Sequence, residues 1–231
     1  MQVTSGELHS CALDTTGSAY CWGENSYGQS TPPSTAFLQV SAGGVHTCGL
    51  NVFDEIECWG SNYAFQSTPP SGSFALVSSG DSHSCALDTT GSAHCWGRDY
   101  DGQSSPPPGY FIYLSAGGNH TCALDLAGSV HCWGDNSYGQ SSPPSGQFVQ
   151  VSSGLEHTCG LEISGDIQCW GSNYSGTYLS NKATAPSGIF TQVTSGWEHN
   201  CAISLTGTLE CWGASWYDLT APPIGYLSYP W

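Results

Sequence analysis

The chain has 231 residues, of which 18 are acidic and only two, Arg98 and Lys182, are basic, so its formal charge is −16 at pH 7. Nucleic acids and anionic membranes are bound through clustered Lys and Arg side chains, so this composition argues against both as partners. No apolar run approaches the roughly 18 residues that a membrane-spanning helix needs, so no membrane insertion is expected.

The first predicted element is a hairpin around the turn from Asp14 to Ser18, which suits a three-residue loop with Gly17 in the left-handed conformation. Counting outward from an Asp14–Ser18 closing pair places Cys11 opposite Cys21, at a non-hydrogen-bonded position. The Cα atoms of such a pair lie about 4.5–5.5 Å apart, which is close enough for a disulfide. The sequence therefore predicts a bridge within this hairpin.

The same hairpin pattern recurs along the chain. Each cysteine pair is ten residues apart, and successive pairs begin 37 residues apart except for one step of 42. The predicted bridges are Cys11–Cys21, Cys48–Cys58, Cys85–Cys95, Cys122–Cys132, Cys159–Cys169 and Cys201–Cys211. The alternative is a His-x-Cys-x9-Cys metal site, but it repeats only three ligands where structural zinc uses four. Twelve regularly spaced cysteines favour disulfides and an oxidising compartment.

Each unit of about 37 residues contains short alternating stretches that predict three strands. Such a unit cannot bury both its faces alone and must stack on its neighbours. The sequence thus predicts an all-β, six-bladed β-propeller that forms a single closed domain over residues 1–231. The expected blades cover approximately residues 3–39, 40–76, 77–113, 114–150, 151–192 and 193–231.

The two ends of the chain are expected to share one strand. The first unit starts at Val3 and lacks the Phe-x-x that precedes the matching valines of later units. The segment from Pro223 to Tyr229 supplies this missing half, with Leu227 aligned with Phe148. Because Met1 leads directly into a predicted strand, we expect a secreted protein without its leader, or a domain of a longer protein.

The repeated motifs Gly-x-x-His, Cys-x-Leu, Gly-x-x-x-Cys-Trp-Gly and Gly-Gln resemble the repeat of the regulator-of-chromosome-condensation family, over essentially the whole chain. The resemblance implies a β-propeller. The best-known member is a nuclear exchange factor for a small GTPase that also binds histones, and another relative is a secreted short-repeat propeller that inhibits β-lactamases. The short repeat and the paired cysteines make the chain more similar in style to the second. It departs from familiar members in having six units instead of seven.

The repeated histidines are the first candidates for catalysis: His9, His46, His83, His120, His157 and His199. Catalytic groups need a distinctive environment, whereas a repeat makes six environments alike. We therefore interpret them as hydrogen-bonding residues at a strand corner, with a pH-sensitive or metal-binding ring as the alternative. The tryptophan after each second cysteine is interpreted as packing between blades. No phosphate loop, serine nucleophile elbow or His-Glu-x-x-His is present. We expect no enzyme activity, cofactor or metal.

Residues that break the repeat are better candidates for binding. Strand directions put the Gly-x-x-His turn and the loop after the third strand on one face, where an insertion around residues 177–181 lies. The predicted binding residues on this face are Tyr174, Tyr178, Lys182, Trp197, Trp216 and Tyr217. Clustered aromatic side chains are typical of binding hot spots. The alternative is ordinary surface, or packing beneath the insertion.

Three functions remain open from the sequence. The chain could be a secreted module that binds a protein partner, a self-assembling subunit of an extracellular structure, or a carbohydrate-binding propeller. Exchange-factor activity ranks last because disulfides belong outside the cytosol. Asn119 and Asn173 lie in glycosylation sequons, and Asn173 is the better candidate because it is in a predicted loop.

Overall fold

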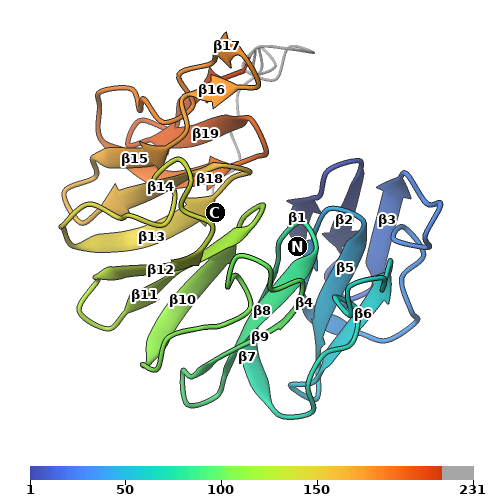
Figure 1. Cartoon of the computed structure of the whole chain (residues 1–231). Helices are drawn as coiled ribbons and strands as arrows, with labels where there is room; N and C mark the ends of the chain where they lie inside the picture. Colours follow the sequence, from blue (N-terminus) through green and yellow to red (C-terminus); the bar gives the residue numbers. More distant parts are fainter. Residues whose placement is uncertain (215–231) are drawn as a thin grey trace.

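The computed structural model describes residues 1–214, which form six three-stranded antiparallel sheets arranged as the blades of a propeller (Figure 1). In every blade the second strand lies between the first and the third. The predicted all-β propeller with three strands per blade is confirmed. Within residues 1–214 there is no helix that is long and apolar enough to cross a membrane.

The first strands of the blades line the propeller axis. They are β1 (Gln2–Ser5), β4 (Phe37–Ala42), β7 (Phe74–Ser79), β10 (Phe111–Ala116), β13 (Phe148–Ser153) and β18 (Phe190–Ser195). The middle strands are β2 (His9–Leu13), β5 (His46–Asn51), β8 (His83–Asp88), β11 (His120–Asp125), β14 (His157–Glu162) and β19 (His199–Ser204). The outer strands are β3 (Ala19–Gly23), β6 (Ile56–Gly60), β9 (Ala93–Gly97), β12 (Val130–Gly134), β15 (Ile167–Gly171) and β20 (Leu209–Gly213). A separate hairpin consists of β16 (Tyr174–Ser175) and β17 (Tyr178–Leu179).

The hairpins have the register that their turns predict. The Asp14 N–H donates to the Ser18 carbonyl at 3.1 Å, and Gly17 has φ of 83°. Cys11 faces Cys21, and the equivalent pairs face each other in all six blades. Their Cα atoms are 4.0–4.1 Å apart, and all twelve cysteines are bridged within their own blade. The predicted bridges are confirmed.

The hydrophobic core lies between the blades. Cys122 and Leu124 of blade 4 pack with Phe148, Val151 and Trp170 of blade 5, and all of them are buried. The other junctions from blade 1 to blade 6 contain equivalent clusters. Each side chain of this size contributes about 1.5–3 kcal/mol when it is fully buried. A single blade has two apolar faces, so stacking is required for stability.

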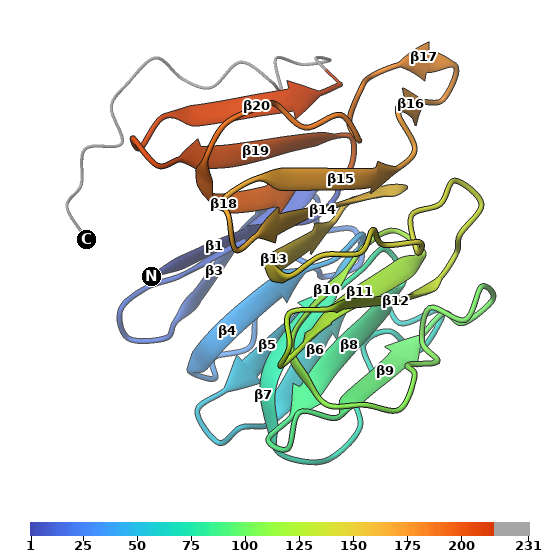
Figure 2. The ribbon, with the colours of Figure 1, turned by 90° about the vertical axis from the view of Figure 1, so that its left-hand side faces the viewer.

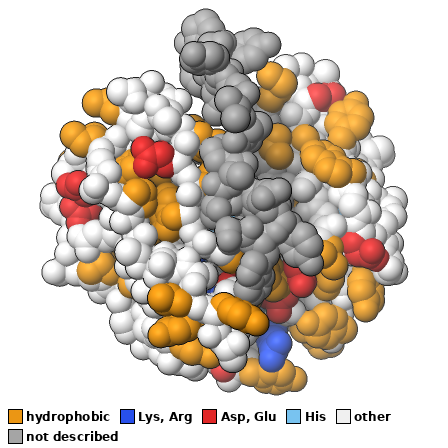
Figure 3. All heavy atoms as spheres, turned by 90° about the horizontal axis from the view of Figure 1, so that it is seen from above, with side chains coloured by type: hydrophobic (Ala, Val, Ile, Leu, Met, Phe, Trp, Pro, Cys, Tyr) orange, Lys and Arg blue, Asp and Glu red, His pale blue; other side chains and the backbone are white. Residues whose placement is uncertain are grey.

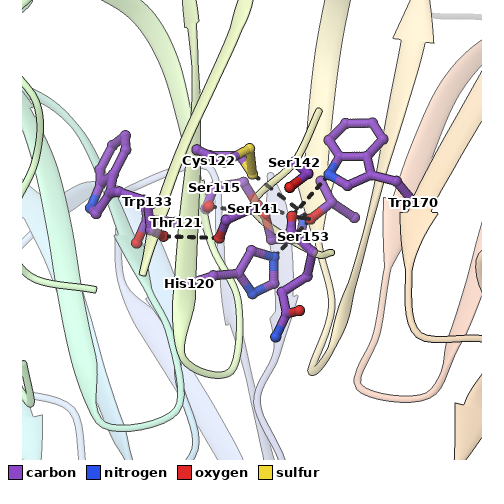
Figure 4. Close-up of a disulfide and its surroundings, with 12 residues drawn as sticks. Ser115, His120, Thr121, Cys122, Trp133, Ser141, Ser142, Ser153 and Trp170 are labelled. Carbon is purple, nitrogen blue, oxygen red and sulfur yellow. Dashed lines mark hydrogen bonds between the residues drawn. A yellow bond between two sulfur atoms is a disulfide. The ribbon is translucent and has the colours of Figure 1, made fainter. Parts of the chain in front are cut away.

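A polar contact accompanies each cluster. His120 Nε2 lies 2.7 Å from Thr158 Oγ1 on the next blade, and the Trp170 indole N–H donates to the Gln140 carbonyl at 2.9 Å (Figure 4). The remaining histidine contacts between blades are His9–Thr47, His46–Ser84, His83–Thr121 and His157–Asn200. Five of the six repeated histidines therefore join neighbouring blades.

Candidate binding face

The hairpin β16–β17 is the local structure that distinguishes blade 5 from the other described blades. Tyr174 pairs with Leu179, and both side chains are exposed, by 54% and 61%. Tyr178, which pairs with Ser175, is 69% exposed. In Figure 2 the hairpin projects beyond the end of β15. The insertion thus presents apolar and aromatic side chains on a short, paired support.

Asn173 holds the base of this hairpin. Its side-chain oxygen accepts the Ala183 N–H at 2.9 Å, and its carbonyl accepts the Ser180 N–H at 2.8 Å. Asn25 makes a similar turn contact in blade 1, where its side-chain oxygen accepts the Ser30 N–H at 2.9 Å. These hydrogen bonds show that Asn173 stabilises the loop that carries the hairpin. Both sequon residues, Asn119 and Asn173, are half-buried. Glycosylation of either residue stays a prediction.

Lys182 lies beneath the hairpin and is completely buried. Its Nζ is 2.7 Å from a Glu198 carboxylate oxygen and 3.8 Å from one of Glu156. The Ser175 hydroxyl donates to the same Glu198 oxygen. The positive charge is neutralised inside the blade 5–6 junction and cannot reach a partner. We therefore assign Lys182 to the support of the face instead of its contact surface.

Trp197 lies in the turn between β18 and β19, half-buried, beside Glu198. Because Glu198 bonds Lys182 and Ser175, this turn and the hairpin are joined on the same side of the molecule. Tyr174, Tyr178, Leu179 and Trp197 together are called the hairpin face below. The other predicted members, Trp216 and Tyr217, lie outside the described residues.

Exposed tyrosines occupy the corresponding loop of the other blades. Tyr27, Tyr63, Tyr100 and Tyr138 are all exposed. The Tyr63 hydroxyl contacts Ser82, in the turn between the first two strands of blade 3, so the loop and the turn share a face as predicted. Seen from above, hydrophobic side chains gather in groups around the molecule, with acidic side chains between them (Figure 3).

A central cavity of about 650 Å³ opens beside these turns. Hydroxyl side chains and glycines from all six blades line it, including Thr4, Ser41 and Thr194. Glu7 and Asp81 also line it, and burial raises the pKa of both carboxyls, that of Glu7 further because Asp81 is near. Within residues 1–214 no group of three or more His, Cys, Asp or Glu side chains could hold a metal ion.

Five of the six histidines that were catalytic candidates are buried in the blade junctions, and the sixth, His199, is half-buried and lines the central cavity. Burial, together with the nearby His157 and His83, lowers the pKa of His120 to about 3. The hydrogen-bond partners of five of these histidines, on the following blade, were not predicted from the sequence. A signal was present, because the residue after every repeated histidine is Ser, Thr or Asn. His94 and His131 occur on two blades only and pair with Asp88 and Asp125, each at 2.9 Å, on the surface.

The sequence matches the family model described as the regulator of chromosome condensation (RCC1) repeat, over residues 2–29, 74–103, 111–140 and 148–177. Among curated proteins, none matches the chain.

Solved structures with this arrangement include two plant receptor-kinase ectodomains. The entire ectodomain of CR4 from Physcomitrella patens is 25% identical, with a TM-score of 0.74, 91% of this chain covered and 61% of that ectodomain. The CRINKLY WD40 ectodomain of ACR4 from Arabidopsis thaliana is 26% identical, with a TM-score of 0.74 and coverages of 93% and 81%. The chain thus spans less than two thirds of the whole CR4 ectodomain.

A third structure is similar in fold alone. Prp20p from Saccharomyces cerevisiae, described together with its binding to Gsp1p and histones, is 18% identical, with a TM-score of 0.75. The match covers 91% of this chain and 71% of Prp20p.

Proposed function

Because the chain belongs to the RCC1 repeat family, we propose that it is a non-catalytic, secreted propeller that binds a protein partner through the hairpin face. The RCC1-like fold and the ectodomain relatives fit a protein-binding module. Six disulfides, together with those relatives, fit an extracellular domain. The particular likeness to a β-lactamase inhibitor stays a prediction.

The observation that carries the proposal is the hairpin β16–β17. Because the blades are similar in sequence and structure, most of the surface is repeated from blade to blade. The hairpin, in contrast, occurs on one described blade and exposes Tyr174, Tyr178 and Leu179. Large side chains on a pre-ordered support lose little conformational entropy on binding, which favours hot spots. The buried Lys182–Glu198 pair supplies part of that support.

The proposal is tested by comparing partner capture from the extracellular fraction of the source organism. We expect Tyr174→Ala combined with Leu179→Ala to weaken binding of the captured partner by about 2 kcal/mol or more, roughly 30-fold in Kd. The matched control is Tyr138→Ala, which removes an exposed tyrosine from the same loop of blade 4. Equal loss in both variants, or in neither, would overturn the choice of this face.

Two other functions give different results in the same experiment. If the hairpin face contacts a second copy of the chain, the wild-type protein will sediment as an oligomer and the double variant as a monomer. If the propeller binds carbohydrate, immobilised glycans will retain it and the captured protein will not compete. Either result would replace the proposed function.

A further inference from the structure

The six turns that join the first two strands of each blade differ from one another at one position. Each turn has the form Gly-x-x-His, and the residue after the glycine changes from blade to blade. In chain order these residues are Glu7, Gly44, Asp81, Gly118, Leu155 and Trp197, and all six line the central cavity of about 650 Å³. Cavities of about 300–1,000 Å³ are typical of ligand sites. The repeat is thus broken at positions that line a cavity of that size.

The two glycines among these residues leave room for side chains from the next blade. A Cβ on Gly44 would lie 2.4 Å from Oδ1 of Asp81, and a Cβ on Gly118 would lie 2.8 Å from Cδ1 of Leu155. A side chain of the following blade therefore lies over each glycine. The result is a cavity wall with carboxyl groups from blades 1 and 3 and apolar side chains from the adjacent blades 5 and 6.

The carboxyl groups of this wall have no cation beside them in the cavity. None of the residues that line it is Lys or Arg, and burial lowers the pKa of His199, so its ring is neutral at pH 7. The charge of Arg98 opposes the rise in the pKa of Asp81, but among the described residues the two form no ion pair. Burial raises the pKa of both Glu7 and Asp81, because a carboxylate is less stable where water is excluded. A cation that entered the cavity would offset this cost.

Hydroxyl groups held by the backbone form much of the remaining wall. Ser41 Oγ accepts the Ser79 N–H at 2.9 Å, and Ser115 Oγ accepts the Ser153 N–H at 3.0 Å. The equivalent hydroxyl groups of the other blades are those of Thr4, Ser78 and Ser152. A hydroxyl group that accepts one hydrogen bond still has a lone pair and a proton to offer. The wall can therefore bond a polar ligand without rearranging.

We propose that the central cavity binds a guanidinium group, as carried by an arginine side chain, with Glu7 and Asp81 accepting its hydrogen bonds and Trp197 stacking on its plane. A guanidinium group is planar, always charged and weakly hydrated, and it stacks on aromatic rings, so it suits this wall better than an ammonium group. The site goes beyond the proposed function and does not depend on it. Partner capture is measured through Tyr174 and Leu179, which do not line the cavity.

Calorimetric titration of the full chain with a blocked peptide, Gly-Gly-Arg-Gly-Gly, tests the site. The control peptide carries citrulline, which has nearly the same shape as arginine but no charge. Salt at about 0.15 M reduces general attraction to the acidic surface, because the screening length is then about 8 Å. We expect saturable binding of the arginine peptide and a Kd about tenfold or more higher for the citrulline peptide. Equal affinities, or no saturable binding of the arginine peptide up to about 10 mM, would overturn the proposal.

The source of the guanidinium group is distinguished in the same titration by arginine amide. A tighter fit of the peptide than of arginine amide would identify an arginine residue of a protein as the natural ligand. Tighter binding of arginine amide would identify a small molecule with the same group. Either order of affinities supports the guanidinium site.

Variants of the wall separate the cavity from the overall charge. We expect Glu7→Gln combined with Asp81→Asn to raise the Kd of the arginine peptide about tenfold or more, and Trp197→Leu to raise it about threefold or more. The matched control is Asp54→Asn combined with Glu55→Gln, which removes the same two charges from an exposed turn outside the cavity. Asn tolerates the positive φ of this position, 63°. Equal losses in the two double variants would show general attraction and overturn the site.

Amide chemical shifts of the labelled wild-type protein cover the case in which a variant does not fold. The arginine peptide should move the resonances of the turns that contain Glu7, Asp81 and Trp197, and leave the turn at Leu126, between β11 and β12, unchanged. Shifts confined to the hairpin β16–β17, or spread evenly over the acidic surface, would overturn the cavity site. Neither result bears on partner capture by the hairpin face, so the two proposals fail separately.

Discussion

The repeated histidine illustrates how one side chain can stabilise a junction without performing chemistry. His120 contributes Nε2 to Thr158 on the next blade, and its ring is completely buried. A buried imidazole must be neutral to avoid the cost of an unpaired charge, which is why burial lowers its pKa to about 3. A general base working near neutral pH needs a pKa near the working pH, so this environment suits structure better than catalysis.

Replacing this histidine should therefore affect stability. We expect His120→Ala to lower the free energy of unfolding by about 1–3 kcal/mol, because the Thr158 hydroxyl loses its 2.7 Å contact with the imidazole and the junction loses a buried side chain. The control is His131→Ala on the same blade, where the side chain is exposed and the effect should stay within about 0.5 kcal/mol. Denaturant titration measures both. An unchanged stability with a lost binding function would contradict the structural role.

Acid should destabilise the propeller through the same residues. The pKa values of His46, His120 and His157 are lowered to about 3, chiefly by burial, and that of His83 to about 4. In the unfolded chain these histidines titrate near 6.5, so below that pH the unfolded state binds more protons. Stability is full above about pH 6.5 and falls as the pH drops, by at most about 1.4 kcal/mol per pH unit for each histidine. Denaturant titrations at several pH values from neutral to about 5 measure this, and a flat profile would contradict it.

At the scale of the element, the hairpins were predictable because their determinants are local. An Asp followed three residues later by Gly fixes the turn, the turn fixes the register, and the register puts Cys11 opposite Cys21. The burial of Lys182 was not predictable in this way. Its carboxylate partners, Glu156 and Glu198, come from two different blades, and only the folded insertion brings them around its Nζ.

Two glycines allow two contributions to stability to be separated: the backbone conformation of a turn and the close approach of the next blade. Gly128 and Gly139 have nearly equal φ values, 81° and 84°, but a Cβ on Gly128 would lie 2.8 Å from the Phe148 carbonyl oxygen, and one on Gly139 would meet nothing within 4 Å. We expect Gly139→Ala to cost about 1–2 kcal/mol from backbone strain alone. Gly128→Ala should cost clearly more, because blade 5 must also move. Thermal or denaturant unfolding measures both, and equal losses would show that the approach of the next blade is unimportant.

At the scale of the whole molecule, stacking was predictable from the repeat, because a three-stranded unit with two apolar faces has no other way to bury them. The hydrogen-bond partners between blades were not predictable from the sequence, because they depend on the rotation that relates each blade to the next. The hairpin face was predictable in part: strand direction placed the insertion and Trp197 on one side, but the sequence could not show which of their side chains are exposed. Tyr174 is exposed, whereas Trp197 is half-buried at the cavity mouth.

The charge of the molecule gives the last prediction. Eighteen acidic residues face two basic ones, and one of these, Lys182, is already neutralised in a junction, so the acidic side chains mostly repel one another. Such self-repulsion destabilises the compact state and is screened by salt. Raising the salt concentration from about 0.01 M to about 0.15 M shortens the screening length from about 30 Å to about 8 Å, so the thermal midpoint at pH 7 should rise. At about pH 5, where more carboxylates are protonated, the same step should have a smaller effect. Calorimetry at both pH values measures this, and a midpoint that falls with salt at pH 7 would mean that attractive ion pairs outweigh the net repulsion.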